Sequence, residues 1–152
     1  MTYILLALHL LSVTIWVGGM FFAYVALRPA AAKMLEAPER LNLWNATFAR
    51  FFFWVWIAVA LILVSGFGMI GMGGGFKSSP IYVNIMMLLG LIMMGIYAHV
   101  FFAPYKRLAR YVAAAEWKAA GDQLAQIRKM VGLNLALGLV TIVVATAGHL
   151  IA

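Results

Sequence analysis

The sequence predicts an all-α integral membrane protein, a four-helix bundle, and three observations point to that fold class. Hydrophobic residues make up 66% of the 152 residues and charged residues only 10%, whereas a soluble domain is about half apolar and about a quarter charged. The apolar residues form four long runs, and the charged residues lie between them. A bilayer is crossed by about 20 apolar residues. We therefore expect a single membrane domain over residues 1–152, with lipid around it.

Each apolar run predicts one membrane span. The predicted spans cover about residues 3–27, 51–72, 81–102 and 130–151. No basic segment precedes Tyr3, which favours a retained first helix over a cleaved signal peptide. Because proline disrupts a helix interior, we expect Pro29 and Pro104 to end the first and third spans. Residues 30–49 then predict a short interfacial helix with a turn, and the basic amphipathic residues 105–129 predict a helix along the interface.

The basic residues indicate how the spans are oriented. The linkers after the first and third spans contain all the Lys and Arg residues except Lys77, which lies between the second and third spans. The positive-inside rule places these basic linkers in the cytoplasm and both termini in the periplasm of a bacterial inner membrane. The same rule accounts for the net charge of +7, so we expect no nucleic-acid partner.

Composition also excludes or disfavours several kinds of site. The sequence has no cysteine, which excludes disulfides, thiolate metal sites and c-type haem attachment. Its four acidic residues all fall in the predicted cytoplasmic linkers, where no nucleophile is paired with a base, so a hydrolase is not expected. The ten methionines are the remaining sulfur ligands.

Polar and small residues repeat at helical spacing within three of the predicted spans. Residues three or four positions apart share a helix face. These faces are His9, Ser12, Trp16 and Gly19 in the first span, Asn84, Leu88, Ile92, Gly95 and His99 in the third, and Asn134, Gly138, Thr141, Ala145 and His149 in the fourth. Because polar groups inside a membrane usually point into the bundle, we expect all three faces to line its interior. Their small residues allow either close helix packing or space for a cofactor.

Histidine and methionine side chains predict a metal site toward the periplasmic side. His9 and His149 lie at similar depth in the first and fourth spans, and Met69 and Met72 end the second span on the same side. Met86 and Met87 open the third span on that side too. Imidazole together with thioether sulfur suits Cu(I). The first hypothesis is therefore a copper-handling or copper-transport module, with His9, His149, Met69 and Met72 as metal ligands.

A second hypothesis uses the same histidines to hold b-type haem. Imidazole ligation between the helices of a bundle is a common haem arrangement, with His9 and His149 as axial ligands or His99 holding a haem nearer the cytoplasm. Trp16 would then form an inner wall of the cofactor site. The protein would be an electron-transfer protein or, if it is an enzyme at all, a haem-dependent oxidoreductase. A third hypothesis is an accessory or assembly subunit whose histidines only bond to one another.

The first span also contains a specific signature. The stretch LHLLSVTIWVGGMFFA, with the spacing L-H-x6-W-x-G-G formed by His9, Trp16, Gly18 and Gly19, resembles the opening of the CopD copper-resistance membrane domain. The later stretches RFFFWVWIAVALILVSGFGMI and IRKMVGLNLALGLVTIVVATAG are similar to the same family. The resemblance implies copper passage or handling at the bacterial inner membrane. A second copy of the chain, or a redox or copper protein, is the protein partner to expect of such a module.

A related group, the HemJ-type protoporphyrinogen oxidases, is similar too. These are four-helix membrane proteins that bind b-type haem, and their first-helix histidine would match His9. Their third-span pair of an aromatic residue and a histidine resembles Tyr97 and His99. That group also has a lysine in the third span, whereas residues 81–102 contain none. The resemblance therefore implies haem binding without implying porphyrinogen oxidation.

Overall fold

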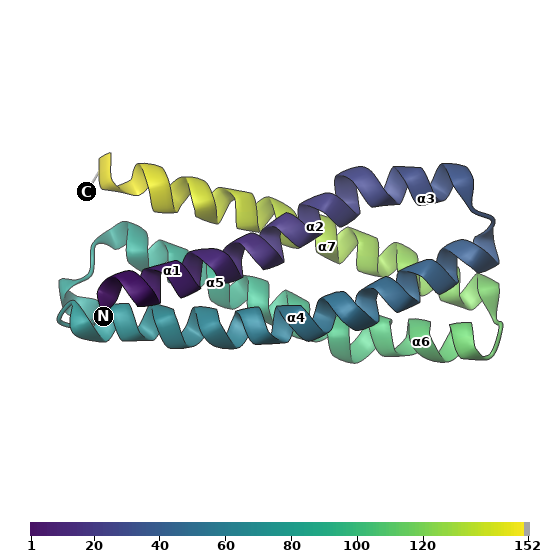
Figure 1. The fold of residues 1–152 in the computed structure, drawn as a ribbon, viewed down its shortest axis with the longest axis horizontal. Helices are drawn as coiled ribbons and strands as arrows, with labels where there is room; N and C mark the ends of the chain where they lie inside the picture. The colour runs from purple at the N-terminus through teal and green to yellow at the C-terminus, as the bar shows by residue number, and fades with distance from the viewer. Residues whose placement is uncertain (151–152) are drawn as a thin grey trace.

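The computed structural model describes residues 1–150, apart from the side chain of His149, and every regular element in that part of the chain is a helix. Four long helices run antiparallel to one another (Figure 1). The first consists of α1 (Thr2–Val13), α2 (Gly19–Phe21) and α3 (Arg28–Met34), joined by the π-helical segments Thr14–Gly18 and Phe22–Leu27.

The other three long helices follow after short connections. The second is α4 (Ala37–Met72). The third consists of α5 (Ile81–Val100), the π-helical segment Phe101–Tyr105 and α6 (Lys106–Ala113), and the fourth is α7 (Trp117–Ala147). Short 3₁₀ turns lie at Phe76–Ser78 and Gly148–Leu150.

All four long helices are apolar enough to cross a membrane, which confirms the predicted all-α, multi-pass fold. They contain 31 to 36 residues each, so they are about 46–54 Å long at about 1.5 Å per residue. The hydrocarbon core of a bilayer is only about 30 Å thick. The helices therefore extend beyond the hydrocarbon on at least one side.

Pro29 and Pro104 do not end their helices, and the expectation that they would is wrong. Pro104 lies inside the π-helical segment Phe101–Tyr105, and Pro29 follows the π-helical segment Phe22–Leu27. Proline removes one backbone hydrogen bond, and its ring crowds a carbonyl group of the preceding turn. A π-helical turn pairs residues five apart rather than four, which gives the ring room. Each helix therefore continues through its proline.

Each basic linker consists of the ends of two long helices joined by a tight turn and contains no separate helix. The chain turns at residues 35–36 and 114–116, so the helix expected along the interface over 105–129 is divided between α6 and α7. These two helices pack against each other along the bundle (Figure 1). Leu108 and Ile127, both fully buried, extend the core between them. The apolar stripes of α6 and α7 therefore cover each other in this part of the bundle.

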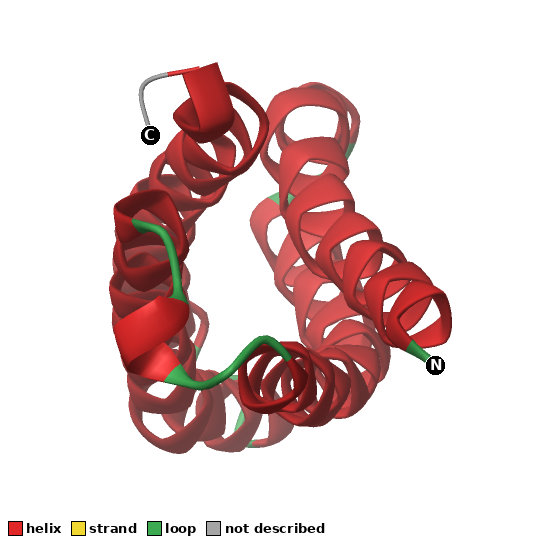
Figure 2. Ribbon diagram, turned by 90° about the vertical axis from the view of Figure 1, so that its left-hand side faces the viewer, coloured by secondary structure: helices red, strands yellow, loops and turns green. Residues whose placement is uncertain are grey.

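Both termini lie at one end of the bundle, and both basic linkers lie at the other (Figure 1). We call these two parts the terminal half and the basic half. Viewed from the terminal end, α1 stands beside α4, and α7 stands beside α5 (Figure 2). The positive-inside rule would put the basic half toward the cytoplasm, and this orientation stays a prediction.

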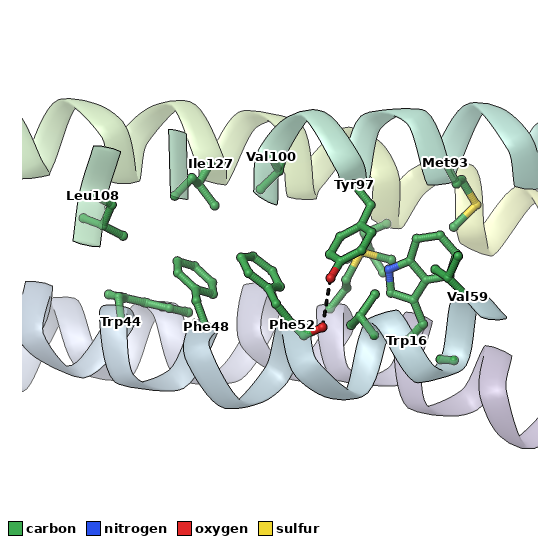
Figure 3. Close-up of a cluster of buried hydrophobic side chains, with 14 of the residues drawn as sticks. Trp16, Trp44, Phe48, Phe52, Val59, Met93, Tyr97, Val100, Leu108 and Ile127 are labelled. Carbon is green, nitrogen blue, oxygen red and sulfur yellow. Dashed lines mark hydrogen bonds between the residues drawn. The ribbon is translucent and has the colours of Figure 1, made fainter. Parts of the chain in front are cut away.

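Aromatic side chains fill the basic half. Phe48 and Phe52 stack with ring centroids 5.1 Å apart, and Tyr105 meets Phe52 edge-on at 4.9 Å. Trp44, Phe48 and Phe52 follow one another along α4 and face the opposite helices (Figure 3). The Tyr97 hydroxyl donates a hydrogen bond of 2.9 Å to the Phe52 carbonyl oxygen (Figure 3). Edge-to-face and offset arrangements of this kind add to the stability that burial provides.

Two of the three expected inner faces are confirmed. On the first helix, Ser12 and Trp16 are buried, and His9 and Gly19 are half-buried. Gly19 has a specific reason to be glycine, because a Cβ atom there would overlap the Phe51 ring. On α7, Asn134 and Gly138 are buried, and Thr141 and Ala145 border a cavity between the helices.

The expected inner face of the third helix is wrong. Leu88, Ile92 and His99 are exposed on the outside of the bundle. The buried face is instead formed by Met93 and Tyr97. Leucine and isoleucine dissolve well in acyl chains, so their exposure costs little. His99 lies about 10 Å before the basic residues of α6 at about 1.5 Å per residue, and so near the polar end of the helix.

Candidate functional site

A cavity of about 580 Å³ lies in the terminal half, between all four long helices. Most of its lining is apolar, with hydroxyl groups at a few positions. Among the described side chains, its imidazole comes from His9. Its thioether sulfurs come from Met69 on α4 and from Met86, Met87, Met93 and Met94 on α5. The cavity is therefore a soft, uncharged environment.

Ser65 on α4 fixes the proton position of His9. The Nδ1 atom of His9 lies 2.9 Å from the Oγ atom of Ser65. The Ser65 hydroxyl donates its own proton to the Leu61 carbonyl oxygen. In the arrangement in which Ser65 donates to Leu61, Ser65 accepts from the Nδ1–H group of His9, because a hydroxyl has a single proton to donate. The Nε2 atom of His9 therefore keeps its lone pair for a ligand.

This pair has the form of a supported metal ligand. Histidines that bind metals commonly donate their second N–H group to a protein acceptor, which sets the tautomer and the ring orientation. Ser65 is almost fully buried, so water does not compete for its hydroxyl. The ring lies against α4 beside Gly66, where a Cβ atom would make an ordinary contact of 3.5 Å with the Cε1 atom of His9.

Trp16 forms the floor of the cavity. Its indole is 3% exposed and meets the Tyr97 ring edge-on, with centroids 5.9 Å apart (Figure 3). Val17 and Met93 complete the floor beside Gly138, where a Cβ atom would lie 2.9 Å from Val17 Cγ2 and 3.1 Å from Met93 Cε. Gly138 is therefore needed for the close approach of three helices at this level.

The structure brings some of the predicted ligands together and separates others. His9, Met69 and Trp16 all border the cavity. Met72 is 50% exposed at the end of α4 and does not belong to the lining. His99 is exposed on the outer side of α5, apart from His9. The side chain of His149 lies outside the described part of the structure, so its place as a ligand stays a prediction.

Sequence reasoning missed Ser65 and the deeper methionines of the third helix, Met93 and Met94. Met86, Gly90, Met93 and Tyr97 are spaced 4, 3 and 4 residues apart and form the side of α5 that faces inward. That spacing was a usable signal, because a stripe of adaptable methionines around a glycine suits an interior. Ser65 is a lone hydroxyl within an apolar run, but only the folded chain shows that it contacts His9.

The described residues do not offer the ligands that hard metal ions or structural zinc require. Among them, no three His, Cys, Asp or Glu side chains gather into a metal-binding group. The ligands that the cavity does offer are one imidazole nitrogen and several thioethers. Such a set is typical for a soft monovalent ion rather than for Mg²⁺, Ca²⁺ or structural Zn²⁺.

Comparison with known proteins places the chain in a family. The family model of copper resistance protein D, CopD, matches residues 45–147. No curated protein and no solved structure matches the chain. The matched region contains most of α4 and all of α5, α6 and α7, including Ser65 and the methionines of the cavity, whereas His9 precedes it. Because this match spans more than half of the sequence, the chain belongs to the CopD family of copper-resistance proteins of the inner membrane.

Proposed function

We propose that this CopD-family protein binds Cu(I) in the cavity of the terminal half and thereby handles or transports copper at the inner membrane. The copper association of the family supports the metal. The observation that carries the proposal is the hydrogen bond between His9 and Ser65 at the edge of a methionine-lined cavity. With Nδ1–H as the donor of that bond, Nε2 of His9 is free to bind the metal. Copper is the substrate or cargo here, not a fixed cofactor.

The charge of the ion also favours Cu(I). Burying an unpaired charge in an apolar site is costly, and the cost rises steeply with the charge of the ion. The described lining contains no carboxylate to neutralise a divalent cation. The burial of a monovalent ion in such a site costs less free energy. Thioethers together with imidazole are also ligands that a soft monovalent ion prefers.

We propose Met69 and Met86 or Met87 as the sulfur ligands that accompany His9. Met69 comes from the end of α4, and the other two come from the start of α5, all in the lining of the same cavity. His149 remains a proposed second imidazole, because it follows the cavity-lining Ala145 by one helical turn in the sequence.

The test is an anaerobic Cu(I) titration of the purified protein against a chromophoric chelator. We expect His9→Ala to lose tight Cu(I) binding at the cavity of the terminal half, because it removes the nitrogen ligand. His99→Ala is the matched control, since His99 is exposed on the outside of α5, and it should bind Cu(I) like the wild type. Equal affinities for the two variants would refute the proposed site.

The volume of the cavity supports a second candidate, a b-type haem. Organic ligands occupy pockets of about 300–1,000 Å³, and the cavity of about 580 Å³ falls in that range. His9 and the apolar walls fit an axially ligated haem. The propionates fit less well, because the described lining offers no Lys or Arg. A Soret band in the purified protein that is lost in His9→Ala would favour haem, and a colourless preparation would exclude it.

A further inference from the structure

A second, much smaller cavity lies on the other side of Trp16. Its volume is about 20 Å³, enough for one water-sized occupant, which needs about 10–15 Å³. Trp16 borders both cavities. The two spaces are therefore consecutive along the bundle and are separated by one indole ring.

One buried polar side chain, that of Asn134, borders this small cavity. The side chain is 3% exposed. Its Oδ1 atom has no hydrogen-bond partner among the described residues. An amide oxygen buried in this way loses its bond to water without a replacement, so the site favours an occupant that brings a proton donor or a positive charge.

Two methionines give the cavity its chemical character. Met20, which is 2% exposed, borders it from the first helix, and Met130 borders it from the fourth. Thioether sulfur on two sides, an amide oxygen and the face of an indole form a neutral, soft surrounding. An indole face also attracts cations. Methionines therefore line the small cavity as well as the large one.

We propose that Met20, Met130 and Asn134 form an inner Cu(I) site, placed in series with the outer site and divided from it by Trp16. This inference rests on the proposed function, because it assumes that copper reaches the large cavity. The aromatic side chains of the basic half close the inner site on its far side, since Phe52 and Tyr97 also border it. An ion there would lie between the indole of Trp16 and the aromatic rings of Phe52 and Tyr97.

The test is the stoichiometry of Cu(I) at saturation, measured anaerobically on the purified full chain. The wild type should bind two ions per chain, and His9→Ala should retain one. A double variant, Met20→Leu with Met130→Leu, should lose one ion and keep the other. Met34→Leu is the matched control, because Met34 is 80% exposed in α3, and it should still bind two. Asn134→Leu provides a second route if the double variant does not fold, and it should also bind one.

The outcomes separate the two proposals. One ion in the wild type, unchanged by substitutions at Met20, Met130 and Asn134, would overturn the inner site while leaving the outer site in place; the small cavity would then hold only water. Two ions in the double variant would overturn it as well. No bound ion in the wild type would overturn the proposed function together with the inference that depends on it.

Discussion

The two halves of the bundle are built from the same four helices but differ in what fills them. In the basic half, stacked and edge-on aromatic rings occupy the space between the helices, and the Tyr97 hydroxyl ties α5 to α4. In the terminal half, methionines, glycines and small hydroxyl residues surround a cavity of about 580 Å³. The packed basic half therefore holds the helices together, whereas the terminal half contains unfilled space between them. Variants in the two halves should therefore fail in different ways.

The largest effect should come from emptying the filled half. Phe52→Ala removes a buried ring at the centre of the aromatic cluster and should lower the free energy of unfolding by about 3–5 kcal/mol. Met87→Ala, at the wall of the open cavity, should cost much less because its side chain already borders empty space. Thermal unfolding in detergent measures both, and equal losses would contradict the contrast between the halves.

Two neighbouring glycines test how closely the first helix must approach α4. Gly19→Ala introduces a Cβ atom into the Phe51 ring, and overpacking of this kind costs about 1–3 kcal/mol. Gly18→Ala meets no atom within 4 Å and should leave stability unchanged or slightly raised, because alanine favours a helix. Unfolding curves that rank the two variants in the opposite order would show that the packing at this level is wrong.

A third comparison tests the contribution of the hydrogen bond between His9 and Ser65 to metal binding. Ser65→Ala leaves the imidazole in place but removes the acceptor that fixes its tautomer, and loss of such a partner typically weakens metal binding about 10–100-fold. Ser79→Ala also changes a hydroxyl at the cavity wall, yet Ser79 bonds to the Gly75 carbonyl group of its own turn. Its Cu(I) affinity should match the wild type. A Ser65→Ala variant with undiminished affinity would remove the argument for a free Nε2 atom.

The smallest expected effect concerns the bond between α5 and α4. Tyr97→Phe keeps the ring but deletes the 2.9 Å hydrogen bond to Phe52, which should cost about 0.5–1.5 kcal/mol. Tyr3→Phe, at an 86% exposed position, is the control and should unfold like the wild type. No difference between the two would mean that the aromatic rings alone hold this level of the bundle.

Much of this fold was predictable, because the long apolar runs and the positions of the charged residues are visible in the sequence itself. The inner faces around Trp16 and Asn134 were also predictable, since costly polar groups lie deep within their spans. The prolines were misjudged because a local π-helical turn, invisible in the sequence pattern, makes room for Pro29 and Pro104. The linkers were misjudged because the sequence pattern does not show that the chain turns at residues 114–116 and that α6 and α7 then pack on each other.

The candidate site was predictable only in part. His9 and Met69 were predicted because both can bind a metal and both lie toward the same end of their spans. The structure brings both to the cavity. The assumption that polar residues mark the inner face failed at His99, which lies close enough to a polar helix end to be exposed. The contact of His9 with Ser65 joins residues 56 positions apart, so no local pattern contains it.

X-ray absorption at the copper edge, on protein loaded with one equivalent of Cu(I), tests the central claim most directly. We predict a mixed shell of sulfur and nitrogen, with imidazole scattering that falls in His9→Ala and is unchanged in His99→Ala. A spectrum without sulfur scatterers, or imidazole scattering that is undiminished by the loss of His9, would contradict the assignment of the terminal cavity as the copper site.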